Sequence, residues 1–183
     1  MTPKKVAVIV GSLRKESFTR KITKNLIALA PPHLQFEFVE IGDLPLYNQD
    51  LDTDPPRSWI DFRTRVKSFD AFLFATPEYN RSVPGVLKNA IDVGSRPYGQ
   101  SAWEGKPGAV ISVSPGASGA FGANHHLRQA LVFLDVPVMQ QPEGYIGGVT
   151  KLLNDQGEVT SEDTKKFLSK FAEKFAVWIE HNS

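Results

Sequence analysis

Three short apolar runs constrain the fold of this chain more than any other feature of its sequence. They span residues 5–10, 71–75 and 109–113 and hold almost no charge. Runs of this length, rich in β-branched and aromatic residues, are typical of strands that are buried on both faces of a sheet. A loop of small and polar residues follows each run, and a helical pattern follows each loop. The chain is therefore expected to be built from strand–loop–helix units.

Two further strands complete the predicted sheet. Residues 34–41 alternate between apolar and polar, as an outer strand does, and residues 136–140 are expected to form a last short strand. Helical faces are expected over five segments: residues 18–30, 59–66, 83–91, 127–134 and 160–178. The last helix carries an aromatic stripe that is expected to lie in the core: Phe167, Phe171 and Phe175.

The alternation of strands and helices favours a parallel sheet with helices on both faces. Right-handed crossovers leave few topologies, and the doubly wound strand order 2-1-3-4-5 is the natural one for five strands. The sequence contains no repeat, linker or low-complexity segment. Residues 1–183 are therefore expected to form a single α/β domain.

Composition argues against several classes of protein. The net charge is +1 and no long run carries one sign, which does not favour nucleic acid or a membrane surface as a partner. No apolar segment is long enough to span a membrane, and the first residues do not resemble a signal peptide. The sequence contains no cysteine, so disulfides and cysteine metal sites are excluded. We expect a cytoplasmic protein without membrane insertion.

In the expected strand order, the loops that begin at Gly11, Thr76 and Ser114 surround one crevice at the carboxyl ends of the strands. The first loop has the chemistry of an anion site, because hydroxyl groups and one arginine lie at the start of a helix: Ser12, Arg14, Ser17 and Thr19. It lacks the motifs of a P-loop and of a dinucleotide-binding fold. A serine-rich helix cap beside an exposed arginine is the alternative.

The second loop can direct backbone N–H groups and one aromatic face at a flat ring, through Pro77, Glu78, Tyr79 and Asn80. Alternatively, Tyr79 is a surface cover and Asn80 a turn residue. The third loop has small residues that allow close backbone approach, among them Ser114 and Gly116, or it is simply flexible. Together the three loops suggest a phosphate at one end and a planar heterocycle at the other, as in flavin mononucleotide (FMN).

Two motifs resemble the NADPH-dependent FMN reductase family, and within it the quinone and chromate reductases. They read Gly11-Ser12-Leu13-Arg14-Lys15-x-Ser17-Phe18 and Pro77-Glu78-Tyr79-Asn80-x-Ser82-x-Pro84-Gly85-x-Leu87-Lys88-Asn89-Ala90-Ile91-Asp92. The resemblance implies a flavodoxin-like fold, bound FMN, NADPH or NADH as hydride donor, and a homodimer or homotetramer. It also implies transfer onward to a small-molecule electron acceptor such as a quinone, a free flavin or a metal oxyanion, and we expect this transfer to follow a ping-pong mechanism.

The resemblance carries over to the cofactor site residue by residue. Ser12, Arg14, Ser17, Phe18 and Thr19 match the phosphate loop; Pro77, Glu78, Tyr79 and Asn80 match the ring-side segment; and Ser114 matches the third loop. One departure concerns assembly, because two residues of the tetramer contacts in this family are replaced here by Gly122 and His125. The cofactor performs the redox chemistry, so no catalytic side chain is expected.

Two other functions are considered. A flavodoxin-type electron carrier would bind FMN without turning over NAD(P)H, but such carriers are usually acidic, and this chain has a pI of about 7.9. A phosphoryl-transfer enzyme would use the Ser12 loop as its anion site, but no Asp pair follows the first strand.

A few histidine, aspartate and aromatic residues outside the three loops have other expected roles. We expect no metal site: His125 and His126 are interpreted as surface or interface residues, and Asp50, Asp52 and Asp54 as solvated. Trp103 and Tyr98 are assigned either to an acceptor pocket or to an interface.

Overall fold

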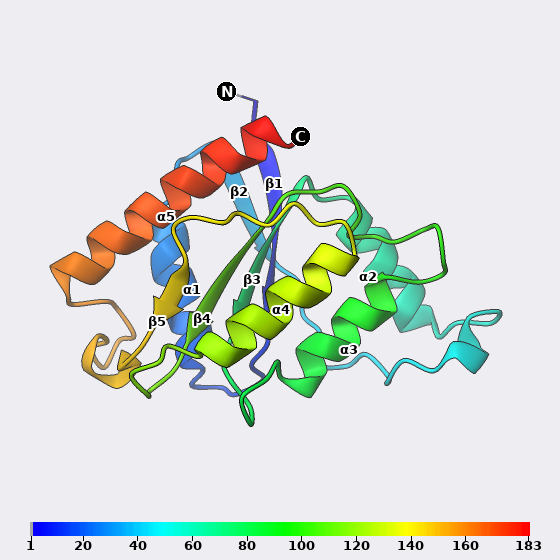
Figure 1. The fold of residues 1–183 in the computed structure, drawn as a ribbon, viewed down its shortest axis with the longest axis horizontal. Coiled ribbons are helices and arrows are strands. Elements are labelled where there is room, and N and C mark those ends of the chain that lie inside the picture. The colour runs from blue at the N-terminus through cyan, green and yellow to red at the C-terminus, as the bar shows by residue number, and fades with distance from the viewer. Residues whose placement is uncertain (1) are drawn as a thin grey trace.

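The computed structural model describes residues 2–183, which form one parallel sheet with helices on both faces (Figure 1). Its strand order, β2-β1-β3-β4-β5, confirms the doubly wound α/β fold. The strands are β1 (Lys4–Val10), β2 (Leu34–Phe38), β3 (Ala71–Thr76), β4 (Gly108–Val113) and β5 (Gly144–Ile146).

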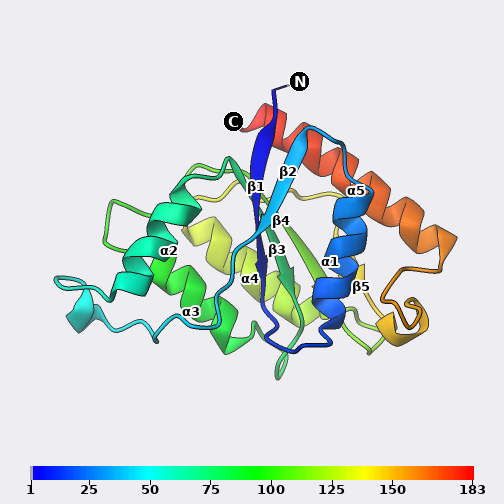
Figure 2. The ribbon, with the colours of Figure 1, turned by 180° about the vertical axis from the view of Figure 1, so that it is seen from behind.

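The helices lie on the two faces of the sheet in unequal number (Figures 1 and 2). Helices α1 (Phe18–Ala28) and α5 (Glu162–His181) cover one face. Helices α2 (Arg57–Lys67), α3 (Gly85–Gly94) and α4 (Phe121–Phe133) cover the other. Short 3-10 helices span Gln49–Leu51 and Val149–Lys151.

The central strands have no exposed face, as their sequences predicted. Every residue of β3 and β4 is buried. Along β1, Val6 and Val8 pack against the α1–α5 layer, whereas Ala7 and Ile9 pack against the α2–α4 layer. The aromatic stripe of α5 contributes to the first of these cores: Phe171 and Phe175 are fully buried, and Phe167 packs against them.

The prediction of a strand over residues 136–140 is wrong. That segment is apolar because Val136, Val138 and Met139 are buried, but it makes only an isolated bridge to Gly108. Pro137 interrupts it and has no N–H to donate to a ladder. The fifth strand, β5, follows this segment instead. The outer strand β2 also ends three residues earlier than predicted, although Val39 still donates its N–H to Val8 O.

Two further expectations are corrected. Trp103 lines neither a pocket nor a surface, because its side chain is completely buried and its Nε1 donates to Ile91 O. Asp52 is not simply solvated, because it is half-buried and accepts a hydrogen bond from the Tyr47 hydroxyl at 2.9 Å. Tyr98 is exposed. Among residues 2–183, no helix combines the length and the apolar character that crossing a membrane requires.

Candidate functional site

The loops after β1, β3 and β4 meet at the carboxyl edge of the sheet, where they enclose a cavity of about 140 Å³. All predicted site residues except Asn80 and Gly116 line it. The lining consists of Ser12, Arg14, Ser17, Phe18, Thr19, Pro77, Glu78, Tyr79, Val113, Ser114 and Pro115. A larger hollow of about 380 Å³ lies beside β2 and α2, but none of the predicted residues lines it. The convergence of the three loops is the stronger indication of a site.

The β1–α1 loop presents unpaired donors to this cavity. Ser17 is the N-cap of α1, and its Oγ accepts from Arg20 N at 3.1 Å, so its own hydrogen remains free to donate. Apart from the turn at Lys15–Glu16, the N–H groups of residues 12–19 donate no hydrogen bond of good geometry within residues 2–183. The hydroxyl-bearing residues Ser12, Ser17 and Thr19 are buried. Buried donors at a helix N-terminus, without acceptors of their own, fit a phosphate group.

Arg14 adds a positive charge at the mouth of the same loop. The residue is exposed, and its guanidinium carbon lies 5.7 Å from the centre of the Phe18 ring. The Phe18 ring thus restricts the position of the Arg14 side chain but leaves its positive charge in place. The electrostatics of this end of the cavity favour an anion.

The β3–α3 loop forms a tight hairpin. Tyr79 and Ser82 exchange two backbone hydrogen bonds of 3.0 Å, and the central residues Asn80 and Arg81 have φ angles of 51° and 64°. These are the angles of a type I′ turn, in which asparagine is favoured. Asn80 is therefore placed in the turn, which is the second of the two roles considered for it. Pro77 and Tyr79 lie on the cavity side.

Glu78 connects this hairpin to α4. Its Oε2 accepts the N–H of Ala123 at 3.1 Å, and its Oε1 accepts from Arg81 Nη1 at 2.9 Å. Burial by itself would raise the pKa of Glu78, but these hydrogen bonds and the Arg81 charge outweigh burial, so the pKa lies below its ordinary value. Helix α4 has no side-chain cap of its own. The carboxylate of Glu78 satisfies its first turn instead.

The β4–α4 loop is not the simply flexible segment that was considered from the sequence. Ser114 donates its N–H to Ile146 O at 2.9 Å and accepts from Val149 N at 3.3 Å. Gly116 lies outside the cavity lining, where its carbonyl accepts from Gly148 N at 3.1 Å. Two residues that sequence reasoning missed, Val113 and Pro115, also line the cavity. Their position next to Ser114 could have indicated them.

No group of three His, Asp or Glu side chains within residues 2–183 is arranged to hold a metal ion. His125 and His126 are exposed on α4. Their ring nitrogens pair with the Tyr145 hydroxyl at 2.8 Å and with Ser82 Oγ at 2.9 Å.

The doubly wound fold and the donor-rich loop after β1 are those of a flavodoxin-like protein. The profile of the NADPH-dependent FMN reductase family matches residues 4–151, and the chain belongs to that family. A quinone reductase of Pseudomonas putida is 61% identical over 178 residues, which cover 97% of this chain and 95% of that protein. A 2-hydroxy-1,4-benzoquinone reductase of a Burkholderia species is 49% identical over 175 residues, 96% of each chain.

Among solved structures, the flavoenzyme NAD(P)H:(acceptor) oxidoreductase FerB of Paracoccus denitrificans superposes with a TM-score of 0.92. It is 48% identical in sequence, and the match covers 98% of each chain. The predicted fold and family are confirmed. These proteins span almost the whole length of the chain, so the likeness is not confined to the cavity.

Proposed function

We propose that this protein is an FMN-dependent oxidoreductase that takes hydride from NADPH or NADH and delivers it to a quinone. The observation that carries the proposal is the set of donors in the β1–α1 loop, among them the buried residues Ser12, Ser17 and Thr19, which shares one cavity with the β3–α3 and β4–α4 loops. A phosphate at one end and a flat ring at the other fit this arrangement.

Each loop has a separate task in holding FMN. The Ser12, Ser17 and Thr19 hydroxyls, the free N–H groups beside them and the Arg14 guanidinium would hold the phosphate. Pro77, Tyr79 and Ser114 would border the ring. Glu78 would hold the Tyr79–Ser82 hairpin against α4. Bound FMN supplies the hydride-accepting ring, so the chain needs no acid, base or nucleophile of its own. Asn80 and Gly116 stay predicted ring-side residues.

A quinone is the acceptor we favour because the Pseudomonas and Burkholderia relatives are named quinone reductases. Tyr79, at the cavity, is half exposed and offers a flat face to such a ring. We propose that donor and acceptor use this place in turn, which gives ping-pong kinetics. Free flavins and metal oxyanions such as chromate are further acceptors to assay.

The deciding experiment is a visible spectrum of the FMN-reconstituted protein under argon. We expect the flavin band to bleach with NADPH and to return with a quinone. A band that ignores both NADPH and NADH would support the electron carrier instead. Failure to retain FMN would overturn the proposal, and phosphatase activity without flavin would favour the phosphoryl-transfer alternative.

We also propose that the protein self-associates in the cytoplasm, as a homodimer or a homotetramer. Large apolar side chains are exposed at both ends of α4, with Phe121 at 52%, Val132 at 70% and Phe133 at 81%. Exposed apolar side chains of this size are common at subunit interfaces. Light scattering on the purified protein tests this proposal, and a monomer at micromolar concentration would contradict it.

A further inference from the structure

We infer that Asn124 is a positioning residue for the flavin site, because it makes the first turn of α4 a shared anchor for both ring-side loops. The inference rests on the proposed function, since it takes the cavity to hold FMN. Asn124 does not line the cavity, and neither motif of the sequence contains it.

The Asn124 side chain is fully buried and fully paired. Its Oδ1 accepts from Arg128 Nε at 2.9 Å. Its Nδ2 donates to Ser112 Oγ at 3.1 Å and to Gly144 O at 3.2 Å. Because a guanidinium can only donate, the contact with Arg128 determines which end of the amide faces Ser112. Asn124 therefore joins α4 to β4 and β5 in one orientation.

The contact with Ser112 extends to the β4–α4 loop. Ser112 is completely buried near the end of β4, and its hydroxyl lies 2.7 Å from Gly119 O, to which it donates. Gly119 is at the far end of the loop that begins with Ser114. The near end is held by Ile146 and Val149. Asn124 thus acts, through Ser112, on the far end of the loop, next to the start of α4.

The residue before Asn124 holds the other ring-side loop. Ala123 donates its N–H to Glu78 Oε2 at 3.1 Å, and Glu78 lies at the base of the Tyr79–Ser82 hairpin. Two consecutive residues of one helical turn therefore bind the two loops, one through its backbone and one through its side chain. A displacement of this turn moves both walls of the cavity together.

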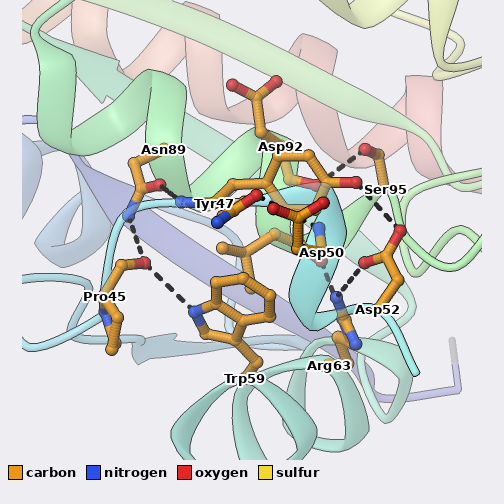
Figure 3. Close-up of polar contacts among 11 residues, drawn as sticks. Pro45, Tyr47, Asp50, Asp52, Trp59, Arg63, Asn89, Asp92 and Ser95 are labelled. Carbon is orange, nitrogen blue, oxygen red and sulfur yellow. Dashed lines mark hydrogen bonds and ion pairs between the residues drawn. The ribbon is translucent and has the colours of Figure 1, made fainter. Parts of the chain in front are cut away.

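Asn89 provides a matched control, because it makes the same kinds of contact for a different loop (Figure 3). It is also a buried asparagine on a helix. Its Oδ1 accepts from Tyr47 N at 2.8 Å, and its Nδ2 donates to Leu44 O and Pro45 O at 3.1 Å. The segment that it holds does not line the flavin cavity.

The experiment compares Asn124→Leu with Asn89→Leu. The apo proteins are examined by amide hydrogen exchange over residues 78–82 and 114–119, and FMN affinity is measured by quenching of flavin fluorescence. The midpoint potential of the bound flavin is measured as well. For Asn124→Leu we expect faster exchange in both segments, a shifted potential and about tenfold weaker FMN binding. Asn89→Leu should lose stability with none of these changes.

Two further substitutions of Asn124 separate loss of the Ser112 hydrogen bond from failure to fold. Asn124→Asp retains the acceptor for Arg128 but cannot donate to Ser112, so it should also weaken FMN binding. Asn124→Ser replaces the leucine variant if that variant does not fold. Unchanged exchange, affinity and potential in the Asn124 variants would overturn the inference, and so would faster exchange in only one loop. If the wild-type chain bound no FMN, the proposed function itself would fail, and the exchange data would still decide whether the two loops share an anchor.

Discussion

At the scale of single residues, side chains distant in sequence cap one helix and fill a gap beside another. Glu78 takes the place of a side-chain cap at the start of α4, where the N-cap position is occupied by Ala120 with a φ of 62°. Trp103 fills the space that Gly94 leaves on α3 and donates to Ile91 O in the same helix. Both relationships can be tested by substitution.

The Glu78 carboxylate should stabilise the fold in a pH-dependent way. Its pKa is lowered in the folded state, so its contribution is complete above the unfolded value of about 4.5 and is lost as the pH falls through the folded pKa. Glu78→Gln should therefore be less stable than wild type at pH 7, and the difference should shrink in acid. Denaturant unfolding of both proteins between pH 3 and pH 7 measures this, using pH steps of about one unit. A difference independent of pH would contradict the assignment.

Gly94→Ala should be strongly destabilising. A Cβ at this position would lie 2.5 Å from Trp103 Nε1, inside a fully buried site. We expect a loss of about 2 kcal/mol in unfolding free energy, the cost of overpacking a core. Gly85→Ala, where a Cβ would meet nothing within 4 Å, is the control on the same helix. In the background of Trp103→Leu the cost of Gly94→Ala should fall, and equal costs in both backgrounds would refute the steric explanation.

At the scale of elements, the candidate site lies where strands β1, β3 and β4 end and the loops to the following helices begin. Residues 12–19 run from the end of β1 into the first turn of α1, and within residues 2–183 their N–H groups donate no hydrogen bond of good geometry apart from the turn at Lys15–Glu16. The β4–α4 loop, in contrast, is tied to residues 146–149 by three backbone hydrogen bonds involving Ser114 and Gly116. In the proposed site, the first segment would hold the phosphate, and the second would border the ring.

The charge of Arg14 should matter for the phosphate and not for the ring. We expect Arg14→Gln to weaken FMN binding while riboflavin, which lacks the phosphate, binds as before. Thermal stability of the apo protein should hardly change, because Arg14 is exposed. Titrations of both flavins at low and moderate salt measure the effect, and Lys15→Gln, next to it and also exposed, is the matched control. An equal loss for both flavins would place Arg14 at the ring.

At the scale of the whole molecule, FMN should stabilise the fold, since the cavity joins loops from three strands. A ligand present at 100 times its dissociation constant adds about 2.7 kcal/mol to the free energy of unfolding. We therefore expect the melting temperature to rise with FMN concentration, and to rise less with riboflavin at the same concentration. A melting temperature unaffected by FMN would contradict the proposed site.

Sequence reasoning succeeded where local chemistry decides the structure. Short apolar runs with almost no charge are typical of strands buried on both faces of a sheet, so β1, β3 and β4 were predictable, and their alternation with helices favoured the strand order. Ser17 and the residues beside it identified the start of α1 because a helix needs a cap. The membership of most predicted residues in one cavity followed from the topology of parallel strands.

By itself, then, the sequence determined the fold class and the three loops that line one cavity. Only the tertiary structure decided that β5 follows Pro142, that Trp103 is core, that Asn80 turns a hairpin and that Glu78 and Asn124 tie two loops to α4. The physical reason is the range of the interactions. Burial patterns and caps act within a few residues, whereas the Trp103–Ile91, Asn124–Ser112 and Glu78–Ala123 contacts join groups that are from 12 to 45 positions apart, and no local pattern specifies their partners.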